Sequence, residues 1–494
     1  MPQVQEVYNE INETLKQAAE RNDLQTVSEQ IPKIEQLLND APNWVPLVFS
    51  LATSRMMLGA HGMAIPLFEW CLQQEKMQQT PEIWNNLGAS WKALNQDKNA
   101  EHCWLKANEL RPTADYYNNL GTLYVNTGQP KRGIPYLLKG MSLDPHMPRL
   151  HWNYGLLLLE QGHWRQGFKH YEFGIASFDR PCRFYDEDPK KVPFWDGEDL
   201  TGKNIVVYGE QGMGDEIMYS SCVNELCEDA NEVVFDCHPR LENLFKRTLL
   251  PMDYYGTRKH MTKLEWPKDH HLDYKVAIGS LFYRYRPNGE FPKKTYLEPD
   301  PELVEHYKKK LADLGPGPYV GIGWEAGYRS TRNDLRSLKL SWFNPLFEKG
   351  GTFVSLQYTA GSEEKCARFF TDTGQRVHHW TDVVEATTPS GDRYTGFDYD
   401  HTAALVRALD LCVVPNTTIA HLCGAMGDDC WTLTPDGCAW RYQLEGEHMP
   451  MYGEHVKQFR QRGRDWTEVL EEVGREYARL YCGTRTELAS EDPG

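Results

Sequence analysis

The stretch Asn204–Tyr219, NIVVYGEQGMGDEIMY, sets the fold of the second half of the chain. It begins with Ile205–Tyr208, an apolar β-branched run that predicts a buried parallel strand. A glycine-rich turn follows, and a helical pattern opens at Asp215. This order presents backbone N–H groups to a ligand in α/β proteins, although a plain turn with Asp215 as helix N-cap has the same pattern. The candidate residues of the turn are Gly209, Glu210, Gln211, Gly212 and Gly214.

Strand and helix patterns alternate downstream of this stretch. The helical patterns include Leu303–Leu314 and Thr402–Leu409. Such alternation predicts parallel sheets covered by helices on both faces. The predicted strands are Glu232–Asp236, Tyr274–Ile278, Tyr319–Trp324, Thr352–Leu356, Leu411–Val414 and Trp431–Thr434.

A turn at residues 313–318, DLGPGP, separates two such sets of strands. We therefore expect two Rossmann-like domains, at 204–315 and 316–463, with a ligand in the cleft between them at the strand carboxyl ends. In the remaining segment, 464–494, the helix Trp466–Leu480 is expected to pack back across the first domain.

Upstream of these domains the chain repeats itself. Gly88, Gly121 and Gly155 occupy one register of three similar segments and lie 33 and 34 residues apart, which resembles the tetratricopeptide repeat. The glycine would let the two helices of each unit lie close together. Residues 1–176 are therefore predicted to form a repeat solenoid, with more divergent units before residue 80. Residues 177–203, rich in Pro, Asp and Lys, are predicted to be a docked linker.

Composition narrows the classes of function. The chain has 494 residues and a formal charge of -17, which argues against a nucleic-acid or anionic-membrane surface. No apolar run has membrane-spanning length, and the polar N-terminus is no signal peptide. The 12 cysteines are scattered without metal-ligand spacing, which is typical of reduced thiols in a cytoplasmic protein.

Two segments at predicted strand ends carry chemistry. In NTTIAHLCGAMG, which starts at residue 416, a helix N-terminus and two hydroxyls suit a diphosphate, although the same residues also suit simple capping and a half-buried histidine. The candidates are Asn416, Thr417, Thr418 and His421. In GWEAGYRSTRNDLRSL, Arg329, Arg332 and Arg336 suit phosphate oxygens, although a solvated loop with surface ion pairs to Asp334 or Glu325 is the alternative.

Several short motifs occur in a fixed order: MGDE, the arginine loop after GIGW, FVSLQ, TAALVRALDLCV, NTTIAHLCGAMG and WRY…FRQ…DW. In this order they resemble the GT-B glycosyltransferases of the heptosyltransferase-like superfamily, and in particular members with tetratricopeptide repeats in front. The resemblance covers about residues 1–170 by repeat and 193–470 by motif order.

The resemblance implies a nucleotide-sugar donor bound mainly by the second Rossmann-like domain. Thr417, Thr418 and His421 would hold its phosphates, with Arg336 where heptosyltransferases place a phosphate-binding lysine. Asp215 matches the position of the proposed general base. Asn416 departs from the family, which more often has Asp there, and this leaves the sugar and the activity open.

The sequence thus predicts a metal-independent glycosyltransferase with no cofactor beyond its nucleotide-sugar co-substrate. Its repeats would bind a protein or glycan acceptor, or join copies of the chain into a homo-oligomer. The alternative is a non-catalytic repeat scaffold with a degenerate transferase domain.

Overall fold

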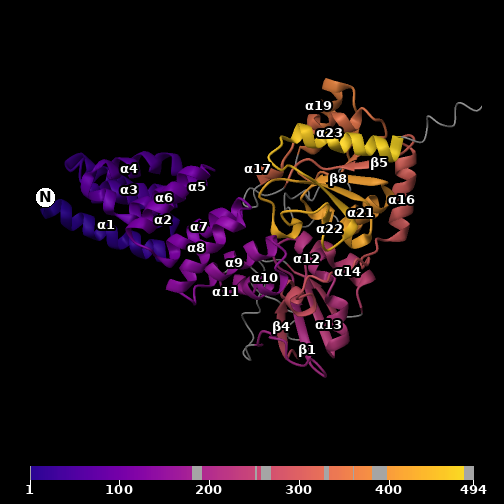
Figure 1. The fold of residues 1–494 in the computed structure, drawn as a ribbon, viewed down its shortest axis with the longest axis horizontal. Coiled ribbons are helices and arrows are strands. Elements are labelled where there is room, and N and C mark those ends of the chain that lie inside the picture. The colour runs from indigo at the N-terminus through magenta and orange to yellow at the C-terminus, as the bar shows by residue number, and fades with distance from the viewer. Residues whose placement is uncertain are drawn as a thin grey trace, which may run out of the picture. The chain divides into compact units, whose positions relative to one another are not determined.

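The computed structural model describes residues 2–177, 179–180, 192–250, 253–257, 269–326, 333–359, 361–380 and 398–482. The chain divides into two compact units, Met1–Leu157 (unit 1) and Leu158–Gly494 (unit 2). Unit 1 is helical, and unit 2 is a mixed α/β region (Figure 1). The described residues contain no helix long and apolar enough to cross a membrane.

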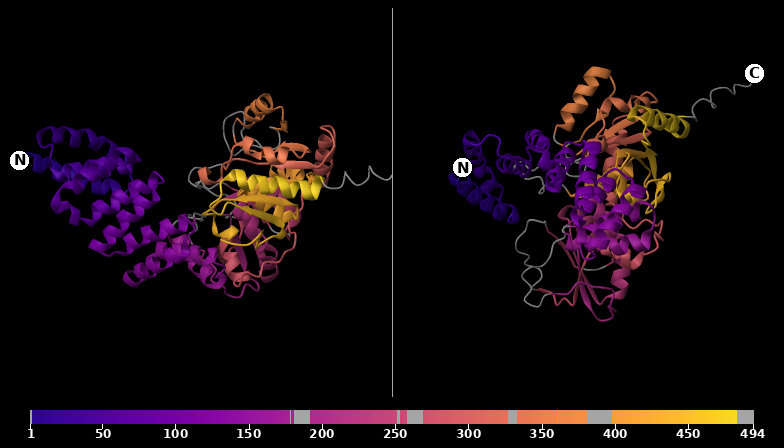
Figure 2. Two further views of the ribbon diagram at one scale, coloured as in Figure 1. Left: turned by 45° about the horizontal axis from the view of Figure 1, so that its top comes forward. Right: turned by 60° about the vertical axis from the view of Figure 1, so that its left-hand side comes forward.

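Unit 1 is a stack of antiparallel helix pairs in chain order, α1 with α2, α3 with α4, α5 with α6 and α7 with α8 (Figure 2). Each pair buries apolar side chains against itself and the next pair, as expected of a repeat solenoid. The helices are α1 (Pro2–Glu20), α2 (Leu24–Asp40), α3 (Val45–Met57), α4 (His61–Gln73), α5 (Pro81–Ala93), α6 (Asp97–Leu110), α7 (Ala114–Asn126), α8 (Pro130–Leu143) and α9 (Pro148–Glu160), which continues into unit 2.

The repeated glycines lie where paired helices touch. A Cβ added to Gly88 in α5 would lie 2.8 Å from the Trp104 side chain of α6, and one added to Gly121 in α7 would overlap Leu137 of α8. Both partners are buried, so neither can swing into solvent. The predicted reason for the glycines, close helix approach, is therefore confirmed at these two positions.

The smaller sheet of unit 2 has four parallel strands in the order β3-β2-β1-β4. The segment before β1 pairs with its edge strand, where Phe194 makes a parallel bridge to Lys275 of β4. Its elements are β1 (Asn204–Tyr208), α12 (Met213–Ser220), α13 (Val223–Asp229), β2 (Glu232–Cys237), α14 (Glu242–Thr248), β3 (Asp253–Gly256), β4 (Tyr274–Ala277) and α15 (Leu281–Tyr285), preceded by α10 (Trp164–Tyr171) and α11 (Phe173–Ala176).

The larger sheet has seven strands in the order β10-β11-β9-β8-β5-β6-β7, all parallel except the β10–β11 pair. Its strands are β5 (Tyr319–Ile322), β6 (Thr352–Ser355), β7 (Val377–His378), β8 (Leu411–Pro415), β9 (Cys430–Thr434), β10 (His448–Met449) and β11 (Gly453–Arg460). Its helices are α16 (Pro301–Ala312), α17 (Asn333–Arg336), α18 (Asn344–Phe347), α19 (Ser362–Thr373), α21 (Tyr399–Ala408), α22 (Thr418–Met426) and α23 (Trp466–Tyr477).

The last helix corrects one prediction. Instead of packing back across the first sheet, α23 packs against α18 and β11 of the larger sheet, as Figure 1 shows in yellow. Trp466, Val469 and Leu470 are buried in one core with Val320 of β5 and Phe353 of β6. The amphipathic pattern predicted the helix, but such a pattern does not specify which sheet its apolar face covers.

Replacing Gly121 with Ala should destabilise unit 1 by about 1–3 kcal/mol, because the new methyl group displaces the buried Leu137. The matched control is Gly62→Ala in α4, where an added Cβ meets nothing within 4 Å. This control should be neutral or slightly stabilising, since alanine has the higher helix propensity. Calorimetric unfolding of the full chain measures both changes, and equal shifts for the two variants would contradict the packing argument.

Candidate functional site

The helix N-termini of α12 and α22 meet at the carboxyl ends of β1 and β8. A Cβ added to Gly214 in α12 would lie 3.0 Å from His421 Cδ2 and 3.4 Å from Thr418 Cα in α22. The two helices pack closely along this contact. The glycine turn after β1 and the NTT segment after β8 are therefore brought together, and they form one site.

In the part of the chain that the structure describes, no side chain caps the N-terminus of α22. Its N-cap residue, Thr417, makes no capping hydrogen bond, and its first turn carries no acidic side chain. Thr417 and Thr418 are half-buried. The free N–H groups and the helix dipole give this end a partial positive charge.

Arg336 and Asn416 lie at the same end of β8. Arg336 donates from Nη1 to the backbone carbonyl oxygen of Asn416 at 2.6 Å. Asn416 is buried, and its Oδ1 accepts hydrogen bonds from the hydroxyls of Thr432 at 2.8 Å and Thr434 at 3.1 Å. Its Nδ2 has no hydrogen-bond partner among the described residues. Arg336, a buried amide donor and an uncapped helix end thus concentrate hydrogen-bond donors in one place.

His421 is enclosed by two tyrosines. Its Nδ1 lies 3.0 Å from the Tyr452 hydroxyl and its Nε2 lies 3.4 Å from the Tyr442 hydroxyl. Burial lowers the pKa of His421 to about 4, with Asp215 raising it and Arg441 lowering it to smaller extents. The imidazole is therefore neutral near pH 7, and both its nitrogens face tyrosines.

Asp215 sits in the first turn of α12 and contacts both sides of the site. Its Oδ2 accepts a hydrogen bond from Gly212 N at 3.2 Å, which caps the helix, and its Oδ1 forms an ion pair with Arg441. Arg441 also donates to Gln211 Oε1 at 2.8 Å. Gln211 has a φ of 58°, the left-handed region, and is held from its other side by a 2.6 Å hydrogen bond to the Tyr171 hydroxyl.

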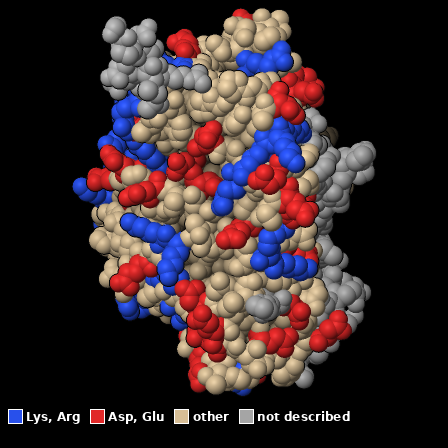
Figure 3. Space-filling model, turned by 90° about the vertical axis from the view of Figure 1, so that its right-hand side faces the viewer, with Lys and Arg blue, Asp and Glu red and all other residues tan. Residues whose placement is uncertain are grey.

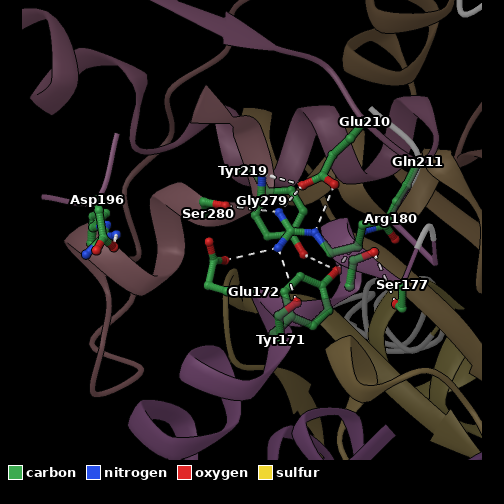
Figure 4. A network of polar contacts seen from close by, with 12 residues as sticks. Tyr171, Glu172, Ser177, Arg180, Asp196, Glu210, Gln211, Tyr219, Gly279 and Ser280 are labelled. Carbon is green, nitrogen blue, oxygen red and sulfur yellow. Dashed lines mark hydrogen bonds and ion pairs between the residues drawn. The ribbon is translucent and has the colours of Figure 1, made fainter. Parts of the chain in front are cut away.

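A buried ion pair fixes the base of the glycine turn. Arg180 binds Glu210 through two hydrogen bonds of 2.9 and 2.6 Å, and both side chains are fully buried. Glu210 also accepts from Gly279 N at 2.7 Å, and Arg180 stacks over the Tyr171 ring at 4.5 Å. Figure 4 shows Glu210, Ser280 and the Tyr171 ring around the guanidinium, with Gly279 bound to Glu210.

The surroundings keep Arg180 charged. Burial acts to lower the pKa of Arg180, but Glu210 and Glu172 raise it well above its ordinary value. An unpaired charge would be very costly at this depth, so each partner depends on the other. Glu210, predicted as part of a ligand-facing turn, is thus bound to Arg180 and Gly279.

Sequence reasoning missed Arg180 and Arg441. Arg180 lies in a polar segment without periodicity, and Arg441 lies in the η7 turn (Trp440–Tyr442) after β9. The available signal was Glu210, because a carboxylate directly after a buried strand requires a cation. The sequence does not show which of the 53 basic residues supplies it.

The structure brings Arg336, the 416–421 segment and Asp215 together, and their roles in donor binding and catalysis stay predictions. Arg329 and Arg332 lie outside the described residues. On the face drawn in Figure 3, lysines and arginines alternate with acidic side chains among the described residues, without one dominant basic area.

Comparison with known proteins supports tetratricopeptide repeats in the first unit. Residues 114–147, which include α7 and α8, match the family model for the tetratricopeptide repeat. The chain thus contains a tetratricopeptide repeat in its helical first unit and continues into an α/β unit with two largely parallel sheets.

Protein FlbA of Caulobacter vibrioides is 32% identical over 317 residues, which is 60% of this chain and 49% of FlbA. The chain therefore spans about half the length of this curated relative. The structure of MamA is 20% identical with a TM-score of 0.29, covering 33% of this chain and 93% of MamA. A thermophilic tetratricopeptide-repeat protein of Thermus thermophilus is 15% identical with a TM-score of 0.29, covering 34% of this chain and 90% of that protein.

Breaking the buried ion pair should destabilise unit 2. Arg180→Met leaves Glu210 buried without its cation, so we expect a loss of about 3–5 kcal/mol in unfolding free energy. The double variant Arg180→Met/Glu210→Leu should recover much of this loss, because no uncompensated charge remains. Urea unfolding of the full chain measures the unfolding free energy of the wild type and of both variants.

The matched control is Lys308→Met, which breaks an exposed pair with Glu305 on α16 and should cost less than about 1 kcal/mol. If the double variant loses as much unfolding free energy as Arg180→Met and Glu210→Leu lose together, the two residues are not coupled.

Protonation of buried His421 should make stability depend on pH. Its folded-state pKa of about 4 lies below the ordinary value of 6.5, so the unfolded chain binds the proton first as pH falls. Its contribution is full above about pH 6.5 and is lost toward pH 4, by up to about 3 kcal/mol. His421→Gln should therefore show a flatter decline between these values in a urea-unfolding series.

Measurement at pH 8, where the histidine is neutral in both states, gives the structural cost of His421→Gln separately. Parallel curves for the wild type and the variant from pH 8 to pH 4 would disprove the assignment.

Proposed function

We propose that unit 2 is a metal-independent glycosyltransferase of the GT-B type, which takes its sugar from a nucleotide-sugar donor. The repeats of unit 1 would bind the acceptor, a protein or a glycan on a protein, since such solenoids commonly bind proteins. The observation that carries the proposal is the uncapped N-terminus of α22, with Arg336 beside it and the Asp215 turn opposite.

An anion is the ligand that this arrangement favours. Free N–H groups at a helix N-terminus and a guanidinium both bind phosphate oxygens. The buried Asn416 Nδ2, without a partner among the described residues, is a further donor. A diphosphate has enough acceptor oxygens for all of these groups at once, and its charge would be offset without a metal ion.

The transfer reaction fits the opposite side of the site. The acceptor oxygen would form a bond to the anomeric carbon as the bond from that carbon to the diphosphate breaks. The electron pair leaves with the diphosphate, and the acceptor hydroxyl passes its proton to the Asp215 carboxylate. Donor groups around Thr417 and Thr418 would stabilise the charge on the departing diphosphate.

Asn416 does not by itself argue for an inactive enzyme. Its Oδ1 accepts from the hydroxyls of Thr432 and Thr434, which joins the ends of β8 and β9. An aspartate at the same place could accept the same two hydrogen bonds, so this function survives the difference in residue. The difference lies at the other side-chain atom: Asn416 has the N–H donor Nδ2 where an aspartate would have a charged oxygen.

The alternative is a repeat scaffold whose α/β unit no longer catalyses transfer. It is favoured by Asp215, whose two oxygens already have partners in Gly212 and Arg441. In that case the wild-type chain would bind no nucleoside diphosphate.

The proposal separates the roles of two residues. Arg336→Ala should weaken the binding of a nucleoside diphosphate by at least about tenfold, because one charge-assisted contact is worth about 1.5–3 kcal/mol. Asp215→Asn should bind with wild-type affinity and lose sugar transfer. Titration calorimetry with a panel of nucleoside diphosphates measures binding, and nucleotide release from the matching nucleotide sugar measures transfer.

The control is Arg376→Ala, an exposed arginine over Phe370 on α19, which should change neither quantity. Unchanged affinity in Arg336→Ala would exclude Arg336 from the donor site, and near wild-type transfer by Asp215→Asn would exclude Asp215 as the base.

A further inference from the structure

Arg441 links the larger sheet to the turn that carries Asp215. Its guanidinium pairs with Asp215 Oδ1 and donates to Gln211 Oε1 at 2.8 Å, so it holds two residues of the opposite turn. The side chain is only 12% exposed, and it lies over the ring of its neighbour Trp440 at 5.2 Å. The position of the Arg441 side chain is therefore supported by contacts other than those to the turn.

The backbone of Arg441 is held as firmly as its side chain. Trp440 packs edge-on against Phe168 and Tyr171 of α10, with ring centroids 5.8 and 5.9 Å apart. Tyr442, on the other side, approaches His421 Nε2 at 3.4 Å. The η7 turn thus packs between α10 and α22, which supports the position of Arg441.

Other charged and titratable groups surround the pair. Burial acts to lower the pKa of Arg441, but Asp215 and neighbouring tyrosines raise it above its ordinary value. Among the described residues, the groups whose charges interact with Asp215 include Arg441, His421, Tyr171, Tyr219, Tyr442 and Tyr452. Of these six, Arg441 is the one that carries a full positive charge near neutral pH, and it contacts the carboxylate directly.

We propose that Arg441 is a positioning residue for the transfer reaction, which aims the Asp215 carboxylate at the acceptor hydroxyl. This inference rests on the proposed function. Its geometric basis is the double attachment to Asp215 and Gln211, which fixes both the carboxylate and the left-handed residue of the turn.

In the transfer step the acceptor hydroxyl gives its proton to Asp215 as its oxygen bonds to the anomeric carbon and the diphosphate leaves with the electron pair. Arg441 loses its ionic partner at that moment and keeps its hydrogen bond to Gln211. The guanidinium therefore remains in place to draw the carboxylate back when the proton is released.

The test compares Arg441→Gln and Arg441→Lys with the wild-type full-length chain. Titration with a nucleoside diphosphate that the wild type binds should give affinities within about twofold for both variants. With the matching nucleotide sugar at saturation, Arg441→Gln should lower kcat by about 100-fold, in the range of a lost positioning contact. Arg441→Lys should restore part of this loss, and KM for the donor should stay near the wild-type value.

The split between kcat and KM is a readout that a purely structural role would not produce. A positioning role lowers kcat in Arg441→Gln while KM for the donor stays near the wild-type value. The matched control is Arg464→Gln, which removes an arginine just before α23 that pairs with Glu472 of that helix, and it should leave both kcat and KM unchanged.

The outcomes distinguish the two proposals. A wild-type chain that binds no nucleoside diphosphate, or releases no nucleotide from any donor, overturns the proposed function and this inference with it. A wild type that turns over donor while Arg441→Gln keeps its kcat overturns the inference alone. A large loss of nucleoside-diphosphate affinity in Arg441→Gln also overturns it, because Arg441 would then bind the donor.

Discussion

The candidate site depends on the close approach of two helix N-termini, those of α12 and α22. Both helix N-termini carry a partial positive charge, so they repel each other unless a negative charge lies nearby. Their close approach also requires a small residue at the contact. Gly214 provides the space, since a side chain there would press on His421 and Thr418. Asp215 provides a negative charge on the α12 side, while the α22 side has none in its first turn. This asymmetry leaves α22 as the end that can still bind an anion.

The glycine turn that carries Asp215 is held by a connected set of buried polar groups. Arg441 joins Asp215 to Gln211, Gln211 joins the Tyr171 hydroxyl, and Arg180 stacks on the Tyr171 ring while it binds Glu210. Successive residues of the glycine turn are therefore attached to different parts of unit 2. Because each partner would be costly to leave unpaired, the set specifies one conformation of the turn.

Local patterns in the sequence predicted most of the architecture. The run Ile205–Tyr208 and the glycine turn gave β1 and the start of α12, because strand and helix periods are local properties. The packing of α23 and the short strand β7 could not be obtained this way, since both depend on distant parts of the chain. The sequence suggested that Arg336 and Asn416 share a site, because both follow predicted strand ends. It could not pair Arg180 with Glu210, since that contact depends on how distant segments pack. Whether the residues at α22 bind a donor sugar stays a prediction.

The most direct test is a crystal structure of the full chain with a nucleoside diphosphate soaked into the crystals. The account predicts diphosphate density against the N–H groups of Thr417 and Thr418, with Arg336 on a phosphate oxygen and Asp215 across the site. Density elsewhere, or an α22 N-terminus that stays without a ligand at a saturating concentration, would contradict it.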